Sequence, residues 1–432
     1  MSESSIQRSA YFWNTVSGVL AAFQSVIWLV VITRVCDLMV AGVFTIAFAL
    51  ANQFLNIGKF GMRNFQASDV VTAGTEPRYS FGDYLLSRIL SSLAMIVCAV
   101  AYVVWASFSL DYGLNKTLVV LLMCLLKVTD AIEDIYHGNY QQYGRLDVAG
   151  RLMTIRTAVT ILILGICIAF THDLVVSLAI TLVTSSLLLV GLILFAQNVH
   201  RLPAGKRTHN WNETLHLLKD CIPLFLMSFL IFYIGNTPRY AIDAYAGDVA
   251  QAIYGFIAMP VFVVALFASF VYAPIIAPLS HLWRERKIGA FLRQFALQVL
   301  WVVLITIGCV IAALFAGVPV LSWLYDTDVS DYLLELCVLV AGGGFLALGT
   351  LFSLGATILR RQSLMIGSYG VVSILAFFCS TYAVRQWDIL GASWAYFFLM
   401  GLLAFGTFLT FAFCVRTAKS TDNENEREQT EP

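Results

Sequence analysis

Residues 149–196 read AGRLMTIRTAVTILILGICIAFT, HD, LVVSLAITLVTSSLLLVGLILFA, and this segment gives the clearest indication of the fold class. Its two apolar runs, 149–171 and 174–196, are separated only by His172 and Asp173. A bilayer core about 30 Å thick needs roughly 20 apolar residues for one helical crossing, so each run is long enough to span it. The stretch therefore predicts a hairpin of two transmembrane helices.

Similar apolar runs fill most of the chain. Of its 432 residues, 59% are hydrophobic and 12% are charged, whereas soluble domains carry about 25% charged residues. Polar or charged breaks separate the other expected helices, which cover 11–33, 42–58, 84–108, 116–136, 221–243, 251–277, 291–316, 333–356, 364–384 and 390–415. The sequence therefore predicts an all-α integral membrane protein with about twelve transmembrane helices.

A polar stretch in the middle of the chain divides these helices into two sets of six. Weak similarity between the ends of the first and seventh helices, ITR at 32–34 and TPR at 237–239, supports an internal repeat. We expect an N-terminal six-helix bundle at 1–196, a cytoplasmic linker at 197–220, a C-terminal six-helix bundle at 221–415 and a cytoplasmic acidic tail at 416–432.

The distribution of basic residues predicts the orientation. Lys and Arg are retained in cytoplasmic loops, and most of the 26 basic residues, Arg88 and Arg156 among them, fall on the side of the N-terminus. The first apolar run lacks a small-residue cleavage site, so we expect it to stay as the first membrane helix. The sequence predicts a multi-pass protein of the cell membrane with both termini in the cytoplasm. Its net charge of zero gives no support for a nucleic-acid partner.

Lys127 is the most deeply placed charge in the predicted spans. A charge at the centre of a membrane helix costs about 2.5–3.5 kcal/mol on insertion scales. Asp130 and Asp134 follow at i+3 and i+7, so we expect all three on one face and Glu133 elsewhere. Two interpretations stay open. The acids form a solvated helix end that neutralises Lys127, or Lys127 is a cavity-lining cation with a titratable partner.

Arg239 is the second candidate cation. Pro238 removes a backbone hydrogen bond and frees the carbonyl of Ile234, while the planar fork of arginine suits phosphate. A broken helix beside a cation would make an anion site. Alternatively, Arg239 is an interfacial arginine or pairs with Asp243 at i+4, and Arg34 shares this ambiguity.

A polar stripe follows one face of the second helix and its extension. Asn52, Asn56, Lys59 and Arg63 recur at spacings of three and four and could line the inner mouth of a cavity. The positive-inside rule also explains Lys59 and Arg63, and the asparagines could bond neighbouring helices.

Other motifs indicate packing rather than chemistry. Gly342, Gly343 and Gly344 predict close helix contact, and Pro260 predicts a bend. The sequence contains no nucleotide-binding loop, zinc motif or nucleophile with a base, so we expect neither an enzyme nor a cofactor.

Four segments carry a resemblance that extends over essentially the whole chain. They are RNFQASD at 63–69, NTPRYAID at 236–243, IYGF at 253–256 and APLS at 277–280. With the topology, they resemble the polysaccharide-transport family of oligosaccharide flippases. This family belongs to the multidrug, oligosaccharidyl-lipid and polysaccharide exporter superfamily, which also holds multidrug and toxin extruders and lipid II flippases.

The resemblance implies a V-shaped pair of six-helix bundles around a central cationic cavity. It implies that the protein moves an undecaprenyl-diphosphate-linked oligosaccharide, a surface polysaccharide repeat unit, from the inner to the outer leaflet by alternating access. The expected substrate-binding residues are Arg239, Lys127, Arg34, Arg63, Asn52 and Asn56. Asp130 and Asp134 are the expected residues for coupling to H⁺ or Na⁺.

Two other functions compete with this hypothesis. A cation-coupled multidrug exporter of the same fold would hold an organic cation with acids and aromatic rings, and the basic Lys127 and Arg239 argue against it. A non-transporting membrane partner of polysaccharide polymerases and glycosyltransferases would not need polar residues inside several spans. A flippase could still have such enzymes as partners.

Overall fold

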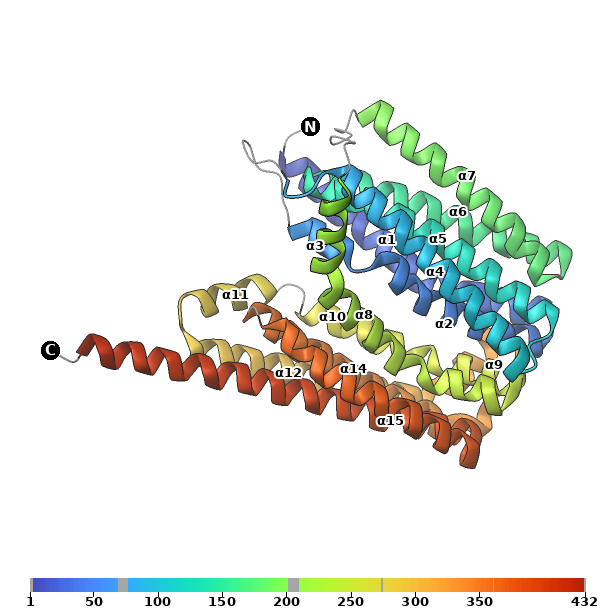
Figure 1. Cartoon of the computed structure of the whole chain (residues 1–432). Helices are drawn as coiled ribbons and strands as arrows, with labels where there is room; N and C mark the ends of the chain where they lie inside the picture. Colours follow the sequence, from blue (N-terminus) through green and yellow to red (C-terminus); the bar gives the residue numbers. More distant parts are fainter. Residues whose placement is uncertain (1–2, 69–76, 201–209, 273–274, 360, 431–432) are drawn as a thin grey trace. The chain divides into compact units, whose positions relative to one another are not determined.

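The computed structural model describes residues 3–68, 77–200, 210–272, 275–359 and 361–430, which are helical almost throughout (Figure 1). They form two compact units, Met1–Phe229 and Leu230–Pro432. Some parts of the sequence named above lie outside the described residues: Asp69, 201–209 of the expected linker, 273–274 of the expected span at 251–277, and 1–2 and 431–432 at the two ends.

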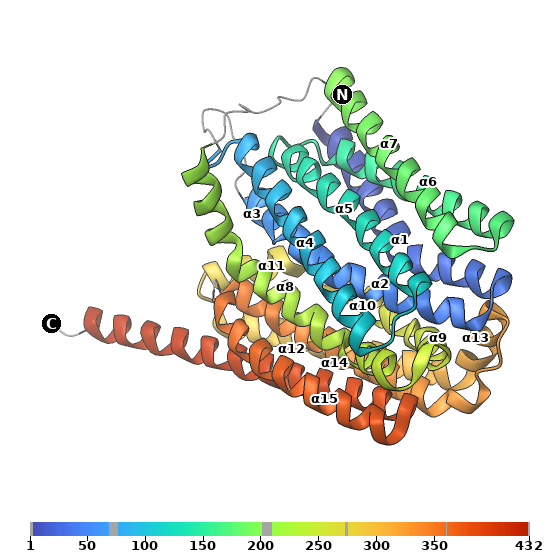
Figure 2. The same ribbon diagram turned by 45° about the vertical axis from the view of Figure 1, so that its right-hand side comes forward.

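The first unit is built around one central helix. Its helices are α1 (Glu3–Val35), α2 (Leu38–Lys59), α3 (Met62–Ser68), α4 (Phe81–Ser109), α5 (Leu114–Gln142), α6 (Leu146–Thr171), α7 (Leu174–His200) and the first part of α8 (Trp211–Tyr245). Helix α5 packs against α2, α3, α4, α6 and α7, and Figure 2 shows these helices running side by side. Lys127, Glu133 and Asp134 of α5 are therefore buried inside the first unit.

The second unit has its own central helix, α14. Besides the end of α8, the unit contains α9 (Gly247–Ala258), α10 (Pro260–Tyr272), α11 (Ile276–Arg284), α12 (Ile288–Ala312), the π-helical segment η2 (Ala313–Gly317), α13 (Val318–Tyr325), the 3₁₀ turn η3 (Ser330–Tyr332), α14 (Leu333–Ile358), the 3₁₀ turn η4 (Gln362–Leu364) and α15 (Met365–Thr430). Helix α14 packs against α9, α10, α12 and α15.

The fold class predicted from the sequence is confirmed. Among the described residues, ten helical stretches are long and apolar enough to cross a membrane. One of them, Gln362–Thr417, is interrupted at Trp387 and Asp388, whose backbone angles are non-helical, and it contains both spans expected at 364–384 and 390–415. Helix α5 is as long as its neighbours, and only its charged residues exclude it from these ten membrane-spanning candidates.

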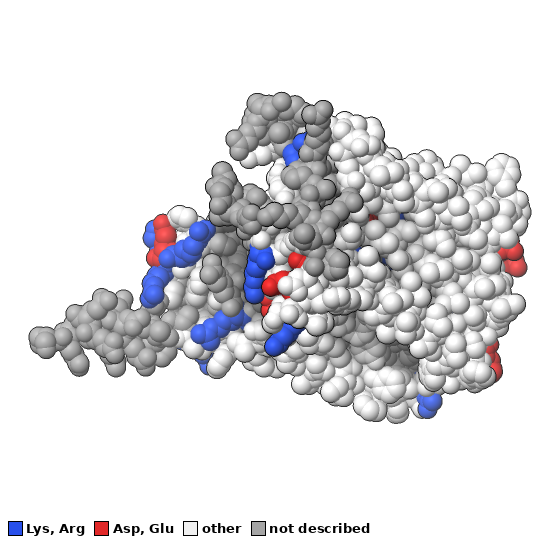
Figure 3. Space-filling view, turned by 45° about the horizontal axis from the view of Figure 1, so that its top comes forward, with Lys and Arg blue, Asp and Glu red and all other residues white. Residues whose placement is uncertain are grey.

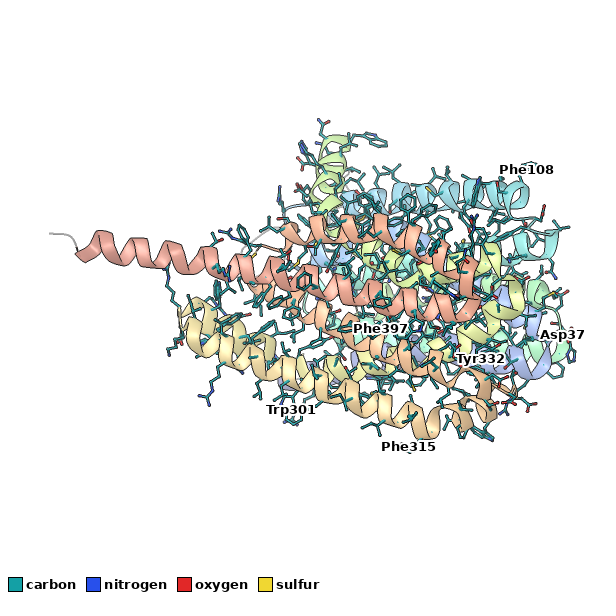
Figure 4. All side chains as sticks on the ribbon, turned by 90° about the horizontal axis from the view of Figure 1, so that it is seen from below. Asp37, Phe108, Trp301, Phe315, Tyr332 and Phe397 are labelled. Atoms are coloured by element: carbon teal, nitrogen blue, oxygen red, sulfur yellow. The ribbon has the colours of Figure 1, made fainter. Side chains whose placement is uncertain are left out.

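The outer surfaces of the helices suit a lipid environment. Large apolar side chains such as Phe108, Trp301 and Phe315, which are 85%, 49% and 77% exposed, point away from the ribbon (Figure 4). Most of the face in Figure 3 is uncharged. Apolar surface of this extent is stable when lipid rather than water covers it.

The two prolines behave differently. The span expected at 251–277 divides into α9 and α10 at Met259, but Met259 keeps helical backbone angles and Gly247–Tyr272 forms one apolar helical stretch, so the predicted bend at Pro260 stays a prediction. The expected break at Pro238 is wrong: α8 continues through it to Tyr245. Proline in a membrane helix is tolerated when its surroundings compensate for the lost hydrogen bond, so Pro238 alone was a poor guide to a broken helix.

The glycines of α14 confirm the predicted close packing. A Cβ atom on Gly342 would lie 2.8 Å from the ring of Tyr396 in α15, and one on Gly343 would lie 3.0 Å from the side chain of Val261 in α10. A Cβ atom on Gly344 would collide with Thr306 in α12. Three successive residues thus allow three different helices to approach α14 closely.

We predict that Gly342→Ala is less stable than the matched variant Gly370→Ala by about 1–3 kcal/mol. Both substitutions gain the same helix propensity, but a Cβ atom at Gly370 meets nothing within 4 Å, whereas one at Gly342 meets Tyr396. Thermal unfolding of the two variants in detergent measures the difference. Equal melting temperatures would show that α15 can move away from α14 at no cost.

Candidate functional site

The first unit contains a polar pocket of about 420 Å³. Helices α2, α3, α5 and α8 contribute to its wall. Its polar lining comprises Asn56, Lys59, Arg63, Asn64, Asp134, Gln141 and Ser228. A volume of this size is within the range of small-molecule sites. Amide and hydroxyl groups can bond sugar hydroxyls, and the two basic side chains can bind an anion.

A sharp turn between α2 and α3 forms one edge of the pocket. Phe60 and Gly61 have positive φ values of 48° and 68°, which end α2 and let α3 begin at Met62. A Cβ atom on Gly61 would lie only 2.7 Å from Leu224 of α8. The ring of Phe60 stacks on Phe225 with 4.5 Å between centroids. These contacts fix the wall that α8 supplies.

Asp134 of α5 is the acidic group of the pocket, and three cations surround it. Its Oδ2 accepts a hydrogen bond of 3.0 Å from Arg88, and its Oδ1 lies 3.6 Å from Arg63 Nη1 and 3.9 Å from Lys59 Nζ. We call Lys59, Arg63, Arg88 and Asp134 the Asp134 network. The side chain of Arg88 is completely buried, whereas those of Arg63 and Lys59 are 32% and 42% exposed.

A second set of charges lies one turn earlier on α5. Arg156 of α6 donates to Asp130 and, at 2.6 Å, to Glu133, and Lys127 donates to Asp130 at 2.9 Å. We call these four residues the Arg156 network. Arg156 also donates to the hydroxyls of Thr129 and Ser185, at 3.0 and 3.1 Å, and the ammonium of Lys127 lies 4.9 Å from the ring of Phe48.

The expectation that Glu133 points elsewhere is wrong. Glu133 joins Asp130 at Arg156, whereas Asp134 belongs to the other network. Residues at i and i+3 of a helix are neighbours, so an arginine on α6 can reach both acids. His137 lies 3.7 Å from Glu133 and is also buried.

The two networks differ in charge. The Arg156 network contains two bases and two acids and is neutral. The Asp134 network contains three bases and one acid, so it has an excess of two positive charges. Its two partly exposed bases line the pocket, so the excess charge faces the space where a ligand can enter. Such a site is suited to an anion, and the described residues contain no group of acids, His and Cys that could hold a metal ion.

Arg88 and Arg156 belong to the two networks although neither was predicted from the sequence to be a site residue. Both were counted among the basic residues of the cytoplasmic side, yet their side chains are 0% and 6% exposed inside α4 and α6. Their position in the sequence could have identified them, because Arg88 and Arg156 fall within the predicted spans 84–108 and 149–171. Acids inside α5 also required buried cations as partners.

The other predicted residues lie outside the two networks. Asn52 and Asn56 donate to backbone oxygens of their own helix, at 2.8 and 2.9 Å, and only Asn56 is among the residues that line the pocket. Arg34 lies exposed in the last turn of α1. Arg239 belongs to the second unit, where its guanidinium lies 6.0 Å from the ring of Tyr254, which is buried.

A polar contact near the start of α4 fastens this part of the first unit to α8. Tyr79 donates to Asp220 at 3.0 Å, and Arg78 pairs with the same carboxylate at 3.0 Å. Burial first, and then the hydrogen bond to Asp220, raises the pKa of Tyr79. The phenol is protonated at neutral pH even with its ordinary pKa, and the higher pKa lets the hydrogen bond to Asp220 persist into more alkaline solution.

Comparison with known proteins supports the fold. No family model matches the chain. The capsular polysaccharide biosynthesis protein CapF of Staphylococcus aureus is 24% identical over 333 residues, which are 74% of this chain and 79% of that protein.

Two solved structures show the similarity in three dimensions. An inward-facing multidrug resistance MATE family transporter of the MOP superfamily gives a TM-score of 0.65 at 14% identity, covering 93% of this chain and 95% of that one. A MOP superfamily transporter from Pyrococcus furiosus, reported to have a binding pocket of reversed polarity, gives a TM-score of 0.53 at 14% identity, covering 96% of both chains. The chain therefore has the all-α membrane fold of the MATE-type transporters.

We predict that Arg156→Met destabilises the protein by about 3–5 kcal/mol, because it leaves Asp130 and Glu133 without their shared cation inside the first unit. Arg151→Met is the matched control. It removes the same kind of side chain from the same helix, where Arg151 makes one hydrogen bond, of 2.9 Å, to Ser9. Thermal unfolding in detergent measures both. A smaller loss for Arg156→Met than for Arg151→Met would contradict a structural role for the Arg156 network.

Proposed function

We propose that this protein is a membrane transporter that moves an anionic lipid-linked oligosaccharide, of the polyprenyl-diphosphate class, from the inner to the outer leaflet by alternating access. The observation that carries the proposal is the pocket of the first unit, where Lys59 and Arg63 lie beside amide groups.

The fold is that of transporters, and the helices of each unit supply what a substrate in a membrane needs. A polyprenyl-diphosphate sugar has a hydrated, doubly charged headgroup and a hydrocarbon tail. The headgroup requires cationic and polar side chains away from lipid, and the tail can stay in the bilayer. The pocket meets the first requirement, and the apolar outer surface meets the second.

The charge of the pocket favours this substrate over an organic cation. The three acids of the inner half of α5, Asp130, Glu133 and Asp134, are each within 3.0 Å of an arginine. An organic cation would have to displace an arginine from one of these acids. A diphosphate would instead meet the two excess positive charges of the Asp134 network, and the fork of an arginine matches its oxygens.

The relative adds a biological context. CapF is described as a capsular polysaccharide biosynthesis protein, and a polymer of that kind is assembled from saccharides that must cross a membrane or be made beyond it. The Pyrococcus furiosus transporter, with its pocket of reversed polarity, is consistent with one fold that carries differently charged pockets. We therefore infer a saccharide substrate with an anionic group for this chain.

The proposal changes the order of the candidate residues. Lys59 and Arg63 become the first phosphate contacts, because Lys127 is already bound to Asp130. Asn56, Asn64 and Gln141 become candidate sugar contacts. Arg239, beside Tyr254, is proposed as a contact in the second unit. Coupling to H⁺ or Na⁺ through Asp130 or Asp134 stays a prediction, and either ion would have to compete with basic partners.

We predict that the protein reconstituted in liposomes accelerates transfer of a polyprenyl-diphosphate oligosaccharide to the opposite leaflet. The double variant Lys59→Ala/Arg63→Ala should slow the transfer at least tenfold, because contacts to a charged group contribute about 1.5–3 kcal/mol each. Accessibility of the sugar to an external glycosidase measures the transfer.

The matched control is Arg284→Ala/Lys287→Ala, which removes two positive charges from the end of α11 and its following turn. Lys287 there is 62% exposed and pairs with Glu285. This variant should transport like wild type. If wild type transfers no more lipid than empty liposomes but exports organic cations, the multidrug alternative is correct. If neither substrate moves, the protein is a non-transporting membrane component.

A further inference from the structure

The two oxygens of Asp134 have unequal partners. Oδ2 receives a hydrogen bond from Arg88 at 3.0 Å, whereas Oδ1 faces Arg63 and Lys59 at 3.6 and 3.9 Å. The first distance is that of a good charge-assisted hydrogen bond. The other two are too long for hydrogen bonds, although electrostatic attraction acts over them. Oδ2 of the carboxylate is therefore hydrogen-bonded to its cation, whereas Oδ1 attracts its two cations without a hydrogen bond.

Arg88, the partner of Oδ2, is anchored to the helices of the first unit. Arg88 is fully buried and also donates to the backbone oxygen of Gly58, in the last turn of α2. Ser91, one turn further along α4, donates to the same oxygen at 2.7 Å. Asp134 is thus held by a side chain that is itself anchored to two helices, and it cannot easily turn away.

The two cations near Oδ1 are partly exposed residues of the pocket wall, in contrast to the buried Arg88. Lys59 and Arg63 have long side chains, are partly exposed, and line the pocket. Removing Asp134 would leave them to repel each other and Arg88. With Asp134 present, they are held near one carboxylate oxygen without using their hydrogen-bond donors on it. Those donors stay available to a ligand that enters the pocket.

We propose that Asp134 is an exchangeable counter-ion: it holds Lys59 and Arg63 together in the empty pocket and gives them up to the phosphate oxygens of the substrate. This inference rests on the proposed function and assigns a positioning role to Asp134 and Arg88. The ligand must outcompete a resident carboxylate, so a dianion such as a diphosphate is selected over a monoanion. The same competition weakens binding, and a transporter has to release its substrate after each cycle.

The chemistry of the exchange requires no bond making. When the ligand binds, Lys59 and Arg63 move from Asp134 to the phosphate oxygens, and Asp134 keeps its hydrogen bond to Arg88. When the ligand leaves, the two cations return to Oδ1. The buried charge of Arg88 stays compensated in both states, which avoids the large cost of an unpaired buried arginine.

The test measures binding of inorganic pyrophosphate to the purified full-length protein by calorimetry. Asp134→Asn should bind pyrophosphate about tenfold or more tightly than wild type, because one competing negative charge is removed from beside the ligand. It should also slow transfer in liposomes, because release becomes slower. Asp147→Asn is the matched control: Asp147 is also buried and paired with an arginine, Arg145 at 3.0 Å, but it is not among the residues that line the pocket. This control should bind pyrophosphate like wild type.

A second variant guards against misfolding. Asp134→Asn leaves Arg88 without its acid, so the double variant Arg88→Gln/Asp134→Asn removes both buried charges and keeps Lys59 and Arg63. It should also bind pyrophosphate more tightly than wild type. If both variants fold but bind no more tightly, Asp134 is not an exchangeable counter-ion.

The outcomes separate this inference from the proposed function. If wild type binds pyrophosphate and Lys59→Ala/Arg63→Ala does not, the anion site stands whatever Asp134 does. If wild type shows no saturable binding, or if Lys59→Ala/Arg63→Ala binds as well as wild type, the anion site itself is wrong and the inference falls with it.

Discussion

Charged groups inside a membrane protein must find their partners within the protein, because lipid offers neither water nor counter-ions. In this chain the constraint acts on α5, which carries Lys127, Asp130, Glu133 and Asp134 within two turns. Helices α4 and α6 supply the partner cations, Arg88 and Arg156. Each is buried and forms an ion pair with one or two of these acids. The packing of the first unit follows from these pairings, because α5 can be central only if its charges are neutralised there.

The two networks show how one helix can serve two purposes. Where bases and acids are equal in number, around Arg156, the charges close on one another and on the hydroxyls of Thr129 and Ser185. Where bases outnumber acids, around Asp134, the excess positive charge faces a pocket. The Arg156 network stabilises helix packing. The Asp134 network keeps positive charge that can bind an anion in the pocket.

The second unit meets the demands of close packing in a different way. Its central helix α14 carries three consecutive glycines, whereas the central helix of the first unit, α5, carries a group of charged residues. Helix α14 contacts α10, α12 and α15 closely at these glycines, by van der Waals packing. Arg239 and the buried ring of Tyr254 give this unit a polar element of its own. The predicted internal repeat is therefore compatible with halves that have diverged in their interior chemistry.

The lipid environment, the helices and the fold class were predictable from the sequence, because the length of each apolar run can be compared directly with the thickness of a bilayer. The sequence also identified Asn56, Arg63 and Asp134, which line the pocket, and Lys127 with Asp130, which pair with each other. It predicted a bend at Pro260, where α9 is followed by α10, and it wrongly predicted a broken helix at Pro238. Helix packing was needed to show that Glu133 shares Arg156 with Asp130, that Arg88 rather than Lys127 holds Asp134, and that Asn52 of the predicted polar stripe is not among the residues that line the pocket. The ion pairs between different helices join residues 23 to 75 positions apart in the chain. Which cation meets which acid therefore depends on how the helices pack, and neither residue spacing nor hydropathy carries that information.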